Sequence, residues 1–319
     1  MKSAHRFPGI ALATAVASVG SGLVAADESV YFSELPVVAS VSRLPQRLAD
    51  APTAVTVIDR DMIKASGVRD LNDVFRLVPG FQTYPHTTEP ARVSYHGLND
   101  EDYSPRVQVL IDGRSMYSPL FGNGVNWATI PVALDDIERI EVVRGTNSVS
   151  YGSNAFLGVI NIITEKASEA GGRLSAGAGS YGSLEGNFLA GAPLGAGFSL
   201  TAGAHYQQSD RAPLDKYYPD SYPKVAAGGL AANQREAYTG EISSHSQYFR
   251  LDYEDRLTVG FYRNNFRSLT STGDKTATSY YLSNAYWDTT IDTWYGKLRF
   301  DITPSLSGET VVDYSTYQI

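Results

Sequence analysis

The sequence predicts a small α/β domain followed by antiparallel transmembrane β-strands. Residues 52–166 mix short strand and helix patterns that glycine residues interrupt. From residue 173 onward the helix patterns vanish, and apolar and polar residues alternate strictly along the chain. Short turns and long polar loops also alternate there, which is typical of a barrel that crosses an outer membrane.

Residues 1–26 have the composition of a signal peptide. Lys2 and Arg6 are basic, Ile10–Val19 is a short apolar run, and Val24–Ala26 is a small-residue cleavage site. The apolar run is too short, and too interrupted by glycine, to span a bilayer as a helix. We therefore expect an exported protein.

The overall composition excludes several classes of protein. The 319 residues contain 26 Lys and Arg, 34 Asp and Glu and no Cys, with a formal net charge of -8. An acidic chain lacks the basic surface of a nucleic-acid binder, so we expect no nucleic-acid partner. Without cysteine, the fold does not depend on disulfides, although an exported chain could form them.

Residues 27–51 are expected to form a periplasmic tether. The segment holds one short apolar stretch, Leu35–Val41, in otherwise polar surroundings. Two readings fit this pattern: a disordered leader, or a strand that a partner protein adds to its own sheet.

The elements expected in residues 52–166 are short. A strand at Thr53–Ile58 precedes a helix that Asp59 or Asp61 caps and that stops at Ser66–Gly67. Asp70 is expected to cap a second helix, which Pro79–Gly80 ends. Further strands are expected at 92–97, 106–113, 137–145 and 158–164. We expect the strand that begins at Ile137 to pair with Val159–Thr164.

Residues 173–319 are expected to contain about seven barrel strands. In one of them Phe198, Leu200 and Tyr206 share a face, opposite Thr201 and His205. A β-sandwich also has alternating strands, but it has no reason to sort its loops by length. An open seven-stranded sheet would leave unpaired edges in lipid, so we expect more strands in the complete protein.

Three motifs in residues 53–164 resemble the plug domain of TonB-dependent outer-membrane receptors. They are TVIDRDMIKASGVRDLNDVFRLVPGFQ, VQVLIDGRSMY and IERIEVVRGTNSVSYGSNAFLGVINIIT, in that order. The later strands are similar to the start of the family's barrel of about 22 strands. The resemblance implies a cell outer membrane location and contact with outer-membrane lipid.

The resemblance also implies TonB-dependent active import of a scarce, bulky nutrient, such as a ferric siderophore, cobalamin or a similar chelate. The TonB complex of the inner membrane would pull on a TonB box, which falls at Leu35, Pro36, Val37, Val38, Ala39 and Ser40. Receptors of the family that also signal to transcription carry an extra domain before the box. Residues 27–34 have no room for one, so we expect transport without signalling.

Other residues take expected roles from their positions in the plug. Family plugs carry Arg-Gly pairs that can lock the plug to the barrel, which suggests Arg144 and, less strongly, His96 as locks. Substrate contacts are expected from the apical loops, where aromatic and ionic side chains suit a bulky chelate. These candidates are Tyr84, His86, Glu89, Tyr117, Phe121 and Trp127, some of which could instead pack against barrel strands.

The alternative function is a surface β protein without energised transport, either an adhesin or a passive pore. A pore needs no domain at 52–166, and an adhesin needs no TonB box. Enzyme chemistry is not expected: the Gly177–Gly182 match to G-x-G-x-x-G precedes no helix, and no Ser/His/Asp constellation is recognisable. The histidines lack metal-ligand spacing, so no metal or cofactor is expected.

Overall fold

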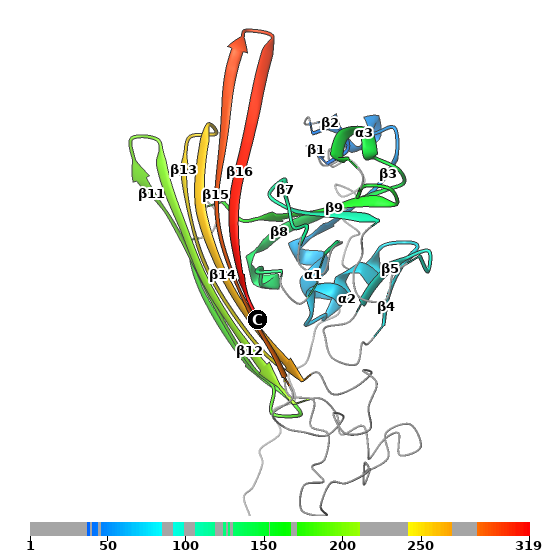
Figure 1. Ribbon diagram of the computed structural model, residues 1–319, viewed down its shortest axis with the longest axis vertical. Coiled ribbons are helices and arrows are strands. Elements are labelled where there is room, and N and C mark those ends of the chain that lie inside the picture. The colour runs from blue at the N-terminus through cyan, green and yellow to red at the C-terminus, as the bar shows by residue number, and fades with distance from the viewer. Residues whose placement is uncertain are drawn as a thin grey trace, which may run out of the picture. The chain divides into compact units, whose positions relative to one another are not determined.

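Residues Pro36–Ile319 form one compact unit, in which the computed structural model contains two main β-sheets (Figure 1). No helix of the described residues is both long and apolar enough to cross a membrane. The structure describes residues 37–38, 40–43, 46–84, 92–98, 106–118, 124–125, 127, 130–152, 154–166, 171–210, 242–269 and 286–319.

The first sheet belongs to the α/β domain, which we call the plug. Its five strands lie in the order β3-β8-β9-β6-β7. The strands β8 and β9 are antiparallel, which confirms the pairing expected for the segment that begins at Ile137. The bounds are β3 Ala54–Asp59, β6 Val107–Ile111, β7 Arg114–Ser115, β8 Ile137–Arg144 and β9 Gly158–Thr164.

The helix α1 (Arg60–Ser66) has the ends that the sequence predicts. The Asp59 side chain accepts a hydrogen bond from the Met62 amide, and Gly67 ends the helix in the left-handed conformation. The second helix is shorter than expected: α2 covers Leu71–Val74 and continues as the 3-10 turn η3, Phe75–Leu77. The side chain of Asp70 makes no cap hydrogen bond and instead accepts one from Gln207.

Smaller elements complete the plug. Two short antiparallel pairs stand outside the main sheet, one formed by β1 and β2 and the other by β4 and β5. The bounds are β1 Val37–Val38, β2 Gln46–Arg47, η2 Leu48–Asp50, β4 Phe81–Tyr84, β5 Arg92–Tyr95, η6 Leu134–Asp136 and α3 Ser148–Tyr151.

The plug core forms where these elements pack on the sheet. Phe75 is fully buried among Ile58, Ile140 and Ile162. Strands β6 and β9 are buried along most of their length. Their sequences are therefore nearly continuous apolar runs, without the alternation of apolar and polar residues found in strands with one exposed face. Apolar burial of this kind stabilises the plug as a folded body.

Gly158 allows the close approach of β9 to β8. A Cβ atom at this position would lie 2.5 Å from the backbone oxygen of Val143. We expect Gly158→Ala to lower the plug's free energy of unfolding by about 1–3 kcal/mol, since the overlap is with backbone that cannot turn aside. Denaturant unfolding checks this. Gly172→Ala, in open space, is the matched control and should change little; equal effects would contradict the prediction.

The second sheet has seven antiparallel strands in sequence order, β10 to β16. Each strand pairs with the next, as expected for consecutive barrel strands. The bounds are β10 Gly172–Ala178, β11 Leu184–Gly195, β12 Phe198–Ser209, β13 Ile242–Tyr253, β14 Leu257–Leu269, β15 Tyr286–Thr303 and β16 Leu306–Gln318.

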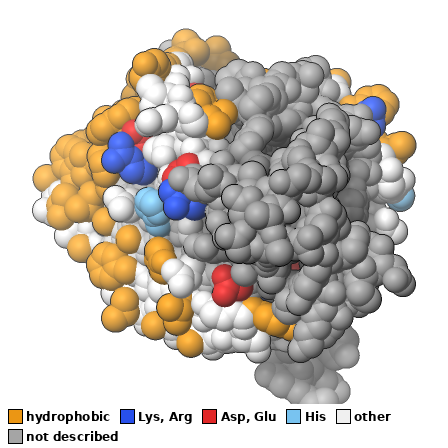
Figure 2. Space-filling model, turned by 60° about the horizontal axis from the view of Figure 1, so that its bottom comes forward, with side chains coloured by type: hydrophobic (Ala, Val, Ile, Leu, Met, Phe, Trp, Pro, Cys, Tyr) orange, Lys and Arg blue, Asp and Glu red, His pale blue; other side chains and the backbone are white. Residues whose placement is uncertain are grey.

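One face of this sheet is apolar and exposed. Phe249, Phe261 and Trp294 lie side by side on neighbouring strands, with ring centroids 4.5–5.7 Å apart. Figure 2 shows hydrophobic side chains gathered over the left side of the view. Exposed apolar side chains also occur on β12 and β16, at Leu200 and Val312. A continuous apolar face is what a lipid-facing barrel wall requires.

The opposite face carries polar and charged side chains. Arg250, Asn264 and Thr293 are each buried there, although each strand also carries exposed apolar residues. Two glycines make room for large rings on this face, because a methyl group at Gly203 or Gly260 would overlap the ring of Tyr248 or Tyr295. These polar side chains face the plug, as the contacts described next establish.

Candidate functional site

The contact between plug and barrel wall starts at a tight turn of the plug. Asp112 and Gly113 join β6 to β7, and both have positive φ angles, 51° and 81°. An Asp-Gly pair suits such a two-residue hairpin turn. Asn161 on β9 accepts a hydrogen bond from the Gly113 amide at 3.1 Å. The turn therefore holds the Asp112 carboxylate in a defined position at the edge of the plug.

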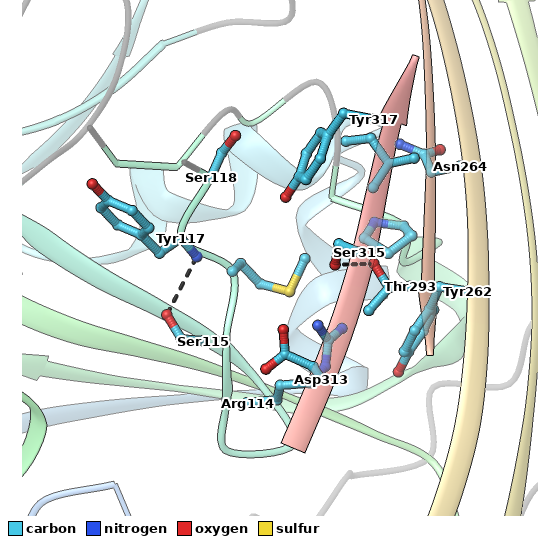
Figure 3. Close-up of a pocket in the computed structure, with 13 residues that line it drawn as sticks. Arg114, Ser115, Tyr117, Ser118, Tyr262, Asn264, Thr293, Asp313, Ser315 and Tyr317 are labelled. Atoms are coloured by element: carbon cyan, nitrogen blue, oxygen red, sulfur yellow. Dashed lines mark hydrogen bonds between the residues drawn. The ribbon is translucent and has the colours of Figure 1, made fainter. Parts of the chain in front are cut away.

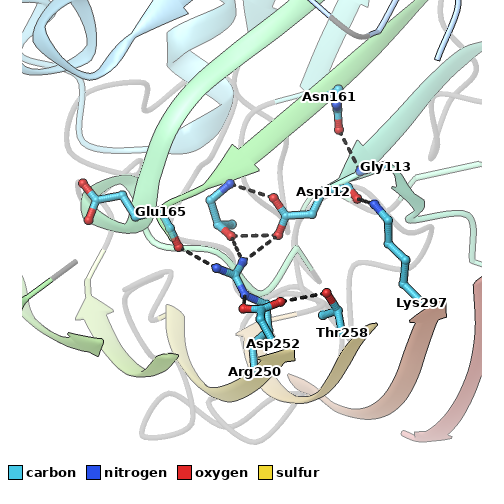
Figure 4. A network of polar contacts seen from close by, with 9 residues as sticks. Asp112, Gly113, Asn161, Glu165, Arg250, Asp252, Thr258 and Lys297 are labelled. Carbon is cyan, nitrogen blue, oxygen red and sulfur yellow. Dashed lines mark hydrogen bonds and ion pairs between the residues drawn. The ribbon is translucent and has the colours of Figure 1, made fainter. Parts of the chain in front are cut away.

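Arg250 on barrel strand β13 reaches this turn (Figure 4). Its Nη1 donates to Thr164 Oγ1 at 2.8 Å and to Asp112 Oδ2 at 3.3 Å. Its Nη2 donates to the backbone oxygen of Glu165 at 2.9 Å. Within the barrel, Asp252 accepts from Nε at 2.9 Å and fixes the guanidinium plane. One buried arginine thus bonds three plug residues.

Lys297 on β15 adds a second cation at the same turn. Its Nζ donates to the Asp112 backbone oxygen at 3.3 Å. The Asp112 carboxylate also accepts from the Thr164 amide at 2.9 Å and from its hydroxyl at 2.7 Å. We call Arg250, Lys297, Asp112, Thr164 and Glu165 the clamp. Because its charges are paired and hydrogen-bonded in a largely buried setting, removing one partner costs much more than at an exposed ion pair.

The side chain of Glu165 joins three parts of the chain. Its carboxylate forms ion pairs with Arg60 at the start of α1 and with Arg173 on β10. Arg60 also donates to the backbone oxygen of Ile137 at 2.8 Å. Glu165 lies just after the last plug strand and Arg173 in the first barrel strand, so this bridge ties the two domains at their junction.

Asp136 makes a third plug–barrel contact. It is 2% exposed, and Asn187 on β11 donates to its Oδ1 at 3.0 Å. Burial raises the pKa of this carboxyl from its ordinary value of 3.8 to about 6, although hydrogen bonds from Asn187 and Tyr248 oppose the rise. Asp136 therefore changes its charge at mildly acidic pH.

The fold should lose stability as the pH rises, because the buried Asp136 carboxyl then has to carry a charge. Because the pKa is raised in the folded state, the stabilising contribution is fully present below pH 3.8 and is lost as the pH rises through about 6. The change corresponds to about 3 kcal/mol. We expect Asp136→Asn to remove this dependence while other carboxylates titrate as before. Thermal unfolding of both proteins from pH 4 to 7 checks it, and parallel curves would contradict it.

The described residues of the expected tether, which begin at Val37, pack on the plug. Val37 and Val38 pair with Gln46 and Arg47, and Val38 is fully buried. The Glu141 side chain accepts hydrogen bonds from the amide of Ser40 at 3.0 Å and from its hydroxyl at 2.6 Å. Leu35, Pro36 and Ala39 lie outside the described residues.

The two residues expected to lock the plug to the barrel, Arg144 and His96, make contacts within the plug. Arg144 is half-buried on β8, its backbone oxygen accepts from Thr53 at 2.8 Å, and its buried Nε lacks a hydrogen-bond partner among the described residues. The ring of His96 is exposed and lies against Tyr95 of the plug, with centroids 4.1 Å apart. A lock between either residue and the barrel stays a prediction.

The six expected substrate residues divide into four groups. Tyr117 is 39% exposed and lines a cavity described below. Trp127 is half-buried, and its ring packs on Phe75 in the plug core at 5.1 Å between centroids. The Tyr84 backbone lies in β4, and its side chain is not described. The remaining three, His86, Glu89 and Phe121, lie outside the described residues.

The clamp residues were missed by sequence reasoning. The Asp-Gly turn could have been recognised, because the dipeptide follows an apolar strand. Arg250 carries no comparable signal, since alternation shows which face it shares but not what stands opposite. Its bond to Asp112 joins residues 138 positions apart.

Comparison with known proteins identifies the class to which this arrangement belongs. Residues 47–159 match the family model of the TonB-dependent Receptor Plug Domain. The vitamin B12 transporter BtuB of Vibrio vulnificus is 36% identical over 155 residues, which are 48% of this chain and 24% of that protein. The iron-regulated outer membrane virulence protein of Vibrio cholerae is 34% identical over 135 residues, 41% of this chain and 20% of that protein.

Solved structures agree in fold. The pyoverdine outer membrane receptor FpvA of Pseudomonas aeruginosa has a TM-score of 0.63 at 18% identity, over 89% of this chain and 40% of that one. The ferric yersiniabactin uptake receptor FyuA of Yersinia pestis has a TM-score of 0.58, also at 18% identity, over 82% and 40%. The chain therefore spans less than half the length of these proteins.

The plug match, the relatives and the shared fold confirm the resemblance drawn from the motifs. Residues 47–159 thus form a TonB-dependent receptor plug domain, and the described residues add a sheet of seven antiparallel strands that shares its fold with the barrels of such receptors. The expected outer-membrane location is confirmed with it.

Proposed function

We propose that the complete protein imports a scarce, bulky nutrient across the outer membrane, with energy supplied through TonB. The observation that carries the proposal is the clamp. A buried barrel arginine bonds three plug residues, so the plug is held firmly against the wall and has to be moved for a solute to pass. A passive pore would gain nothing from such a closure, and an adhesin would not need it.

The substrate class we propose is a ferric siderophore, cobalamin or a similar chelate. One relative is named as a vitamin B12 transporter and another as an iron-regulated protein, which supports this class. Of the proposed substrate contacts, Tyr117 presents an exposed ring.

The proposed contact with TonB is an added strand at the box Leu35–Ser40. The pairing of β1 with β2 involves only two residue pairs, and Val37 is 54% exposed. Such a short ladder can be exchanged for a longer one with a partner strand, because main-chain hydrogen bonds supply the affinity in this mode.

Val38→Pro tests this function. We expect uptake of labelled cobalamin or ferric siderophore by cells that carry the full-length receptor to fall to the level of a TonB-deficient host, since proline removes a main-chain donor. Binding of the chelate at the cell surface should stay unchanged, and Val37→Ala is the control. Uptake that persists without TonB would favour the passive pore, and surface binding without uptake in the wild type would favour the adhesin.

A further inference from the structure

A cavity of about 210 Å³ lies between the plug hairpin β6–β7 and the inner face of β14–β16 (Figure 3). The side chains that matter for its chemistry take no part in the clamp. Most residues that line the cavity are polar or charged, which suits a small polar ligand. Those that bear on ligand binding are Arg114 and Ser115 from the plug, and Tyr262, Asn264, Thr293 and Asp313 from the barrel wall.

Arg114 is held in place by two barrel tyrosines. Its guanidinium lies 5.1 Å from the ring centroids of both Tyr262 and Tyr295, within cation–π range. The residue is 7% exposed. Its Nη2 is nevertheless buried without a hydrogen-bond partner among the described residues. A rigidly held guanidinium with a free N–H edge suits the planar, two-oxygen geometry of a carboxylate.

Asn264 supplies a second unpaired donor to the same cavity. The residue is 3% exposed, and its Nδ2 has no hydrogen-bond partner in the described part of the chain. A buried donor without a partner is unfavourable, and more so for a charged group. By contrast, the hydroxyls of Thr293 and Ser315 bond each other at 2.8 Å. A ligand that binds in this cavity should therefore present acceptor oxygens to both Arg114 and Asn264.

Asp313 sets the charge of a suitable ligand. It lies on β16 opposite Tyr295 and its carboxylate lines the cavity together with Arg114. A simple anion would be attracted by Arg114 and repelled by Asp313. A ligand with a carboxylate and a nearby ammonium group is attracted by both residues, because its carboxylate pairs with Arg114 and its ammonium group with Asp313.

We infer that this cavity is a binding site for a small zwitterion of the α-amino acid class. The carboxylate binds Arg114 and Asn264, and the ammonium group faces Asp313. The site lies between plug and wall and shares Tyr117 with the proposed chelate contacts, but the inference goes beyond the proposed import function, since binding here requires neither TonB nor a chelate.

Alanine and propionate are the probes, because they differ only in the ammonium group. Binding to the purified full-length receptor in detergent is followed by saturation-transfer NMR titration. We expect alanine to bind the wild type about tenfold more tightly than propionate, and Asp313→Asn to abolish that preference by weakening alanine and strengthening propionate. Arg114→Gln should abolish binding of both, whereas Arg114→Lys should retain part of it.

Controls separate binding from folding. Arg263→Gln removes an arginine that pairs with Asp292 at 2.6 Å, away from the cavity, and should leave both affinities unchanged. Each variant is checked for the heat-dependent gel mobility of a folded barrel. Failure of the wild type to bind either probe would leave a merely hydrated cavity and overturn the inference. Equal affinity for the two probes, or an Asp313→Asn protein that keeps its preference for alanine, would overturn it as well.

Discussion

Replacing Arg250 with alanine is expected to free the plug from the barrel wall. The guanidinium donates to Asp112, Thr164 and Glu165, and its side chain is 9% exposed. Its loss leaves the Asp112 carboxylate without this counter-charge in a half-buried site. Breaking a buried pair by removing one partner costs about 3–5 kcal/mol. In Arg250→Ala we expect the free energy that holds the plug against the barrel wall to fall by this amount.

Hydrogen exchange measures this change directly. The Thr164 amide, which donates to Asp112 Oδ1, should exchange much faster in Arg250→Ala than in the wild type. Arg250→Lys should give an intermediate rate, since it keeps the charge but not the three-way geometry.

Arg256→Ala is the matched control for this experiment. This arginine lies in the turn after β13, and its side chain is 65% exposed, so its long ion pairs with Glu254 and Asp301 contribute little. Unchanged protection of Thr164 in Arg250→Ala would show that the clamp does not hold the plug.

The second large effect is expected at Glu141. This carboxylate is fully buried, accepts two hydrogen bonds from Ser40, and pairs with Arg139 at 3.0 Å. Asn161 also donates to the Ser40 hydroxyl at 3.1 Å. Glu141→Ala removes the acceptor for two donors and leaves Arg139 with less charge compensation. Leaving such groups unpaired costs about 3 kcal/mol or more.

We expect Glu141→Ala to release the segment around Ser40 from the plug. Trypsin cleavage after Arg43 provides the measurement, because a detached segment is cut far faster than a docked one. Ser40→Ala should have a smaller effect in the same direction. Glu138→Ala is the control, since Glu138 lies on the same strand, is partly exposed and also pairs with Arg139. A cleavage rate equal to that of the wild type would contradict the assigned role of Glu141.

The sequence predicts the strand that carries Glu141 but not the contacts of its side chain. The strand that contains Glu141 was expected from its β-branched residues, and its pairing with Val159–Thr164 was expected too. That Glu141 points into a closed polar network was not expected, because its partner Ser40 lies 101 positions earlier. A surface role would have been the usual assumption for a glutamate on a strand.

The sequence by itself determined that an α/β unit precedes antiparallel strands, the longer strands of the plug sheet, and the two faces of barrel strands such as β12. These features depend on local patterns: the Asp59 cap and Gly67 end of α1, and the alternation along β12. The tertiary structure alone decided which polar side chains meet. Arg250, Asp112 and Glu165 come together because the plug packs against the barrel wall, and alternation along a strand carries no information about what lies opposite it.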